Sequence, residues 1–168
     1  ASQITSGGPE DAVRISFGPS GPVRAERADP LGYDGLVERF AREGFRLPSP
    51  DEWEYLCGGG AETLFRWGDT VPDDGYPVDR IPSGFEAHRQ PNAFGLVIAS
   101  NPYLSELTGA PGISRGGDGR VTACGGAGFL VGWLPLATAY DEPQFCRHEA
   151  GEEIQPGFTV ARRVAALR

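Results

Sequence analysis

Apolar side chains recur every three or four positions between residues 33 and 43. The positions concerned form one stripe: Tyr33, Leu36, Val37, Phe40 and Ala41. This spacing follows the 3.6-residue period of a helix with one face turned to a core. Gly44 supplies the stop that commonly follows a helix. The pattern therefore predicts a core-packing helix over 33–43.

A second, shorter helix is predicted at about 50–57. Ser49 is a favourable N-cap, Pro50 suits the first helical position, and Glu52 completes a capping box. Three apolar residues then share one face: Trp53, Leu56 and Cys57. We therefore expect the Cys57 thiol to have a packing role.

Strand-like alternation appears near the N-terminus. Residues 13–17 alternate apolar and polar side chains, residues 18–21 (GPSG) have turn composition, and residues 22–25 resume the strand pattern. A β-hairpin is predicted there. The polar residues 1–12 are expected to be a flexible arm.

The last third of the chain again has strand composition. Residues 120–123, 136–140 and 157–161 are predicted to join a small antiparallel sheet. Residues 65–113 consist mainly of turn signals, which predicts long ordered loops. The chain is thus expected to be a single α+β domain over residues 1–168, with two helices, a small sheet and many loops.

Composition and charge narrow the possible functions. The 25 glycines and 15 prolines of the 168 residues favour a loop-rich fold. A formal charge of −8 argues against nucleic acid or an anionic membrane as partner, because phosphate binding needs basic patches. A small molecule, a peptide or a protein all remain open as ligands.

The three cysteines, Cys57, Cys124 and Cys146, fit no zinc-binding spacing. Free buried thiols in a cytoplasmic protein are the simplest interpretation, and one disulfide plus one thiol is the alternative. The N-terminal residues show no signal-peptide pattern. We therefore expect a cytoplasmic protein.

Five segments together resemble the formylglycine-generating enzyme and sulfatase-modifying-factor family. Residues 45–55 (FRLPSPDEWEY) are similar to its R-L-P-[ST]-x-x-E-W-E-Y signature. Residues 65–69 (FRWGD) and 91–96 (PNAFGL) match its [FY]-x-W-G-[DN] and P-N-x-[FY]-G-L motifs. The glycine pair 125–126 and residues 157–158 resemble its R-G-G-S and G-F-R elements.

The resemblance implies a formylglycine-generating-enzyme-like variant of the C-type lectin fold. It also implies a ligand pocket near the glycine pair, at four positions: Cys124, Trp133, Tyr140 and Arg162. Cys124 stands where the family has the arginine of R-G-G-S, so its thiol is the one weak candidate for a catalytic group. No neighbour in the sequence supplies a base, and structural burial is the simpler role for this thiol.

The chain departs from the family at the catalytic cysteines. The family's oxidases bind copper through two cysteines that follow the R-G-G-S strand, and the equivalent positions here fall near Leu130 and Pro135. No cysteine lies within residues 125–145. Because copper(I) needs soft thiolate ligands, copper binding and formylglycine-generating activity are not expected.

Calcium is one metal that the sequence leaves possible. Asn101 keeps the asparagine of the family's G-N-x-W-E-W calcium motif, whose other residues are replaced in this chain. Asp69, Asp73 and Asp74 form an oxygen-rich turn of the kind calcium prefers, although a solvated acidic turn is the simpler interpretation.

Iron is the remaining metal hypothesis. A two-histidine, one-carboxylate site would need both histidines of the chain, His88 and His148. Both neighbourhoods have the composition of solvated loops, so we expect surface histidines that do not meet. The sequence thus favours a non-catalytic binding or accessory domain; the alternative is an oxidoreductase that uses non-haem iron or Cys124 in the same pocket.

Overall fold

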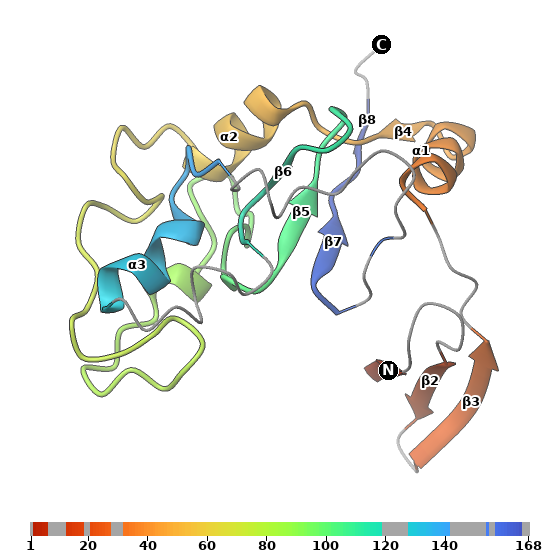
Figure 1. Ribbon diagram of the computed structural model, residues 1–168, viewed down its shortest axis with the longest axis horizontal. Coiled ribbons are helices and arrows are strands. Elements are labelled where there is room, and N and C mark those ends of the chain that lie inside the picture. The colour runs from red at the N-terminus through yellow and green to blue at the C-terminus, as the bar shows by residue number, and fades with distance from the viewer. Residues whose placement is uncertain are drawn as a thin grey trace.

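The N-terminal residues form a three-stranded antiparallel sheet in the computed structural model. Strands β1 (Ser2–Ser6), β2 (Val13–Gly18) and β3 (Gly21–Arg27) follow one another in the order β1-β2-β3. The structure describes the following parts of the chain: residues 2–6, 13–18, 21–27, 32–118, 128–141, 154 and 157–165. The predicted hairpin is confirmed as β2 and β3, whereas the segment expected to be an arm contains β1. In Figure 1 this sheet lies at the opposite end of the molecule from helix α3.

Both predicted helices are present. Helix α1 spans Tyr33–Arg42 and helix α2 spans Pro50–Gly58. The structure adds a short helix α3 (Phe129–Trp133) and two 3-10 turns, η1 (Ala87–Arg89) and η2 (Leu134–Leu136). The capping box predicted at the start of α2 is confirmed, because the backbone N–H of Glu52 donates to Ser49 Oγ (3.1 Å) and that of Ser49 donates to Glu52 Oε2 (2.8 Å).

Two further small sheets connect distant parts of the chain. Strand β4 (Phe45–Arg46) pairs antiparallel with β8 (Val164–Ala165). Strand β5 (Ser105–Leu107) pairs antiparallel with β6 (Ser114–Arg115) and parallel with β7 (Thr159–Ala161). The C-terminal segment therefore joins two separate regions of the fold (Figure 1).

Two sequence predictions about this part of the fold are wrong. The strand predicted at 157–161 exists as β7, but it pairs parallel to β5 instead of joining an antiparallel sheet. Residues 136–140 form no strand: η2 ends at Leu136, and a turn follows. Pro135 explains the second error, because its fixed φ and missing N–H favour a tight turn over a strand. The segment predicted as a strand at 120–123 lies outside the described residues.

Among the described residues, the core consists of two groups of buried side chains. The larger one joins α2 to α3 and η2, and its fully buried members include Trp53, Cys57, Phe65, Trp133 and Leu136. The smaller one contains Leu36, Leu47 and Leu107. Tyr33 and Phe40 of α1 pack against this smaller group, whereas Val37 is 37% exposed.

The long connection between α2 and β5 is ordered by its own packing. Apart from η1 and an isolated bridge between Phe65 and Gly68, this described stretch is irregular. Trp67 stacks on Phe65 with ring centroids 4.9 Å apart. The molecule is thus a loop-rich α+β protein, and this part of the sequence prediction is confirmed.

Candidate functional site

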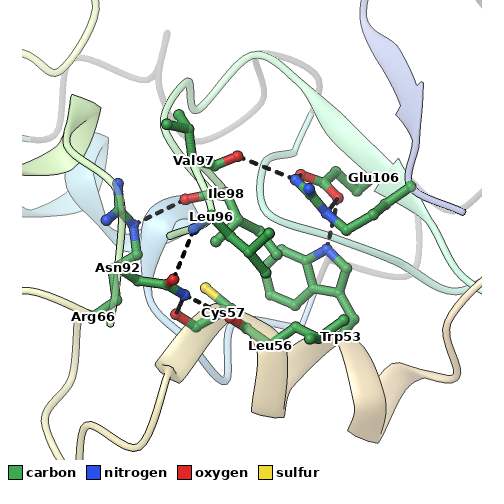
Figure 2. A network of polar contacts seen from close by, with 10 residues as sticks. Trp53, Leu56, Cys57, Arg66, Asn92, Leu96, Val97, Ile98 and Glu106 are labelled. Carbon is green, nitrogen blue, oxygen red and sulfur yellow. Dashed lines mark hydrogen bonds and ion pairs between the residues drawn. The ribbon is translucent and has the colours of Figure 1, made fainter. Parts of the chain in front are cut away.

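A buried carboxylate connects α2 to the C-terminal segment. Glu106 of β5 is 7% exposed, and its Oε2 accepts a hydrogen bond from Trp53 Nε1 at 2.9 Å (Figure 2). Arg162 donates to both carboxylate oxygens, through Nε and Nη2, each at 3.1 Å. Two-point pairing of this kind compensates for much of the cost of burying the charge. Glu106 therefore serves as a fixed acceptor for partners from two other elements.

Arg162 has a second contact that extends this cluster. Its Nη2 donates to the carbonyl of Val97 at 3.2 Å. The Arg162 side chain thus connects the end of β7 both to β5 and to the loop that precedes β5. The resemblance suggests a ligand-pocket role for Arg162, yet its described contacts are within the protein.

Arg66 is a buried cation held by backbone carbonyls. Its Nε donates to Ile98 O at 2.9 Å (Figure 2), and its Nη2 donates to the carbonyl of His88. Burial lowers the pKa of Arg66 from its ordinary value. These contacts join three separate segments of the irregular region, so this motif residue acts as a structural crosslink.

Asn92 organises a turn within the third matched motif, residues 91–96. Its Nδ2 donates to the carbonyls of Leu56 (2.6 Å) and Cys57 (3.1 Å), which are free acceptors at the end of α2 (Figure 2). Its Oδ1 accepts from the backbone N–H groups of Phe94 (3.0 Å) and Leu96 (3.1 Å). The Nδ2 bonds hold the turn against the helix end, and the Oδ1 bonds close the turn itself.

That turn presents an exposed aromatic pair. Phe94 lies beside Tyr55 of α2, with ring centroids 5.4 Å apart. Tyr55 is 67% exposed and Phe94 is 45% exposed. Large aromatic side chains that are held in place yet reach solvent are common in binding surfaces. Sequence reasoning missed this pair because the motif match drew attention to Trp53 and not to its neighbour two positions on.

The predicted pocket residues have structural roles where the structure describes them. Trp133 is fully buried, and its Nε1 donates to Gly75 O at 3.1 Å. Tyr140 is half-buried, and its hydroxyl lies 3.4 Å from Asp118 Oδ2. Cys124 lies outside the described residues, so whether these positions form one pocket stays a prediction.

The predicted calcium ligands have local hydrogen bonds. Asn101 Oδ1 accepts from the N–H of Tyr103 at 2.9 Å, and Asp69 Oδ1 accepts from the N–H of Leu64 at 2.8 Å. Asp74 accepts from the backbone and hydroxyl of Ser83, while Asp73 is exposed. Within the described ranges, no three His, Cys, Asp or Glu side chains come together as a metal site.

The expectation for His88 is wrong. The side chain is fully buried, and its Nε2 lies 2.9 Å from the carbonyl oxygen of Pro77. The sequence EAHR has the composition of a solvated loop, but Trp67 and Trp133, which are distant in the sequence, pack against the His88 ring. His148, its proposed partner in an iron site, lies outside the described residues.

Cys57 behaves as the sequence predicts. Its thiol is free and buried in the larger core group, where burial raises the pKa of Cys57 to about 12. A thiol with so high a pKa is protonated at neutral pH and is a poor nucleophile or metal ligand. Cys124 and Cys146 lie outside the described residues.

Comparison with known proteins gives no match to a family model, a curated protein or a solved structure. The described part of the chain also contains no helix long and apolar enough to cross a membrane.

Proposed function

We propose that this protein is a non-catalytic binding or accessory domain that has kept a formylglycine-generating-enzyme-like variant of the C-type lectin fold. One observation carries the proposal: the polar residues of its family-like motifs are hydrogen-bonded within the protein. Trp53, Arg66 and Asn92 come from three different motifs, and each donates to a buried carboxylate or to backbone carbonyls. Motif residues used in this way stabilise the fold, and their hydrogen-bond donors need no bound substrate as a partner.

The distribution of cysteines in the sequence also supports this proposal. The segment that would carry the two copper ligands contains no cysteine. The described thiol, Cys57, is buried and has a raised pKa. The enzymatic alternative depends on Cys124 and His148, which lie outside the described residues, and calcium binding at Asn101 stays a hypothesis.

The contact surface we propose is the exposed aromatic pair of Tyr55 and Phe94. Asp51 precedes Tyr55 by four positions on α2, so its carboxylate lies on the same face of the helix. Glu54 follows Asp51 by three positions, so its carboxylate lies next to that of Asp51. The whole chain carries a formal charge of −8. An aromatic ring beside carboxylates favours a cation, through both ion pairing and cation–π attraction. The proposed partner is therefore a peptide segment rich in Arg or Lys.

Selection from a random peptide display library tests this proposal. The protein should enrich peptides with basic residues, and Tyr55→Ala should weaken their binding about tenfold, as expected for an aromatic anchor. Leu130→Ala is the matched control, because Leu130 of α3 is 55% exposed but belongs to another element. Failure to enrich any peptide, or equal losses in the two variants, would contradict the proposed surface.

A further inference from the structure

His88 lies inside a group of aromatic rings. Phe85 stacks parallel to its imidazole, with ring centroids 5.9 Å apart. Trp133 and Trp67 meet it edge to face, at 4.9 Å and 6.3 Å. The side chain is 0% exposed, so the imidazole has lost contact with solvent.

The hydrogen bond of the His88 ring shows which nitrogen carries the proton in the neutral form. Nε2 faces the carbonyl oxygen of Pro77 at 2.9 Å, and a carbonyl can only accept, so Nε2 carries the proton. Nδ1 then keeps a lone pair, and this buried atom has no hydrogen-bond partner among the described residues. The arrangement fits the neutral imidazole with its proton on Nε2.

Protonation would place a second N–H at Nδ1, where the described residues offer no acceptor. A buried, unpaired cation is costly, because no water replaces the lost hydration. Attraction to the surrounding ring faces offsets part of this cost. The charged groups nearby are Arg89 and Arg66, which oppose protonation, and Glu86, which favours it.

Glu86 offsets little of that cost. It is paired with Arg89 at 3.2 Å, and both side chains are more than 40% exposed. The other residues in contact with the ring, Phe85, Trp67, Trp133 and Pro77, contribute no charge. Burial accordingly lowers the pKa of His88 below its ordinary value of 6.5.

The same residue joins a long loop to the core. We call residues 74–90 the latch loop. Two hydrogen bonds between described residues connect it to the rest of the molecule: Trp133 Nε1 to Gly75 O and Arg66 Nη2 to His88 O. The bond between His88 Nε2 and Pro77 O closes the loop on itself, as do the bonds of Arg89 to Pro77 and Asp79. The Arg66 bond uses the backbone carbonyl of His88, whereas the His88 ring itself packs against Trp67 and Trp133, which lie outside the loop. Expulsion of the ring would therefore remove these aromatic contacts with the core and the bond to Pro77.

We propose that His88 is an acid-sensitive latch: its neutral ring holds residues 74–90 against Trp67 and Trp133, and protonation of the ring releases this loop. The device is independent of the binding surface at Tyr55 and Phe94. It would make the exposure of the latch loop depend on pH in the range just below neutrality.

The sign of the effect follows from linkage. The open loop binds the proton at the ordinary His pKa of 6.5, whereas the closed loop binds it only at lower pH. The closed form is therefore fully favoured above pH 6.5 and becomes progressively less so as the pH falls toward the pKa of the closed form. The opening constant should rise by up to about tenfold for each pH unit within this window.

Amide hydrogen exchange of the latch loop, measured at pH 7.5 and 5.5 and corrected for intrinsic exchange rates, tests the proposal. Protection of residues 74–90 should fall about tenfold at the lower pH. Residues 50–58 of α2 should keep their protection. An equal loss in both segments would mean global acid unfolding and would contradict a local latch, as would unchanged protection of the loop.

Two variants and a second measurement identify the group responsible. His148→Gln should leave the pH dependence of latch-loop exchange unchanged. His88→Phe should abolish this pH dependence, although it keeps an aromatic ring among Phe85, Trp67 and Trp133. If His88→Phe does not fold, NMR titration of His88 in the His148→Gln protein gives an independent result. A His88 pKa at or above 6.5 would overturn the proposal, and a lowered value supports it.

Discussion

Glu106 shows how much of this protein depends on single buried polar residues. Its carboxylate accepts from Trp53 of α2 and, at both oxygens, from Arg162 after β7. The Arg162 side chain is 26% exposed and that of Glu106 is 9% exposed, so the pair is largely removed from water. A pair in this position is costly to form but still more costly to break on one side.

Glu106→Gln should therefore destabilise the protein by about 2–3 kcal/mol. This value lies below the ~3–5 kcal/mol expected for a fully buried pair, because Arg162 keeps some contact with water. Chemical denaturation measures the difference in the free energy of unfolding.

The chain provides a matched control for this substitution. Glu43 pairs with Arg163, the residue after Arg162, at 2.9 Å, but the two side chains are 41% and 54% exposed. Glu43→Gln should cost less than about 1 kcal/mol. Similar losses in the two variants would show that burial of the Glu106 pair has no special weight.

Helix α2 carries Tyr55, so its stability determines how firmly the proposed binding surface is held. Ser49 and Glu52 cap its start, and Glu52 also pairs with Arg46, whose guanidinium lowers the pKa of Glu52 to about 2. Asn92 binds the free carbonyls at its other end. A helix of nine residues is marginal by itself, so caps at both ends help to hold the Tyr55 ring in position.

Ser49→Ala should destabilise the protein by about 1 kcal/mol, since it removes the acceptor for the N–H of Glu52. Ser49→Thr keeps a hydroxyl oxygen at the same position and should cost less. Thermal denaturation of the two variants checks the difference. If both have the stability of the unsubstituted protein, the cap adds nothing to stability.

At the scale of the whole molecule, local signals predicted the helices and the N-terminal hairpin. The N-cap at Ser49, the stripe from Tyr33 to Phe40 and the turn at residues 18–21 each act over a few positions, so the sequence displays them directly. The strand pairing of β7 with β5 joins residues more than fifty positions apart, and nothing in residues 157–161 specifies a parallel neighbour. Helix α3 was missed because five residues are too few for a helical period to show.

The same distinction holds for the site. Packing of Cys57 followed from its place beside Leu56 on a short helix, and it is confirmed. Burial of His88 could not be predicted, because Trp67 and Trp133 reach it from segments distant in the sequence. Glu106 belongs to no motif that the sequence analysis recognised. A carboxylate between Ser105 and Leu107 in a buried strand is nevertheless uncommon, and such a residue is a candidate for a buried ion pair.

The central proposal is that this chain keeps a family-like scaffold without the family's oxidase chemistry. Incubation of the purified protein with copper(I), oxygen and a peptide containing C-x-P-x-R tests it most directly, with mass spectrometry of the peptide as the readout. The account predicts that the peptide mass stays unchanged, because residues 125–145 contain no cysteine to bind copper. Steady, enzyme-dependent conversion of the peptide cysteine to formylglycine would contradict it.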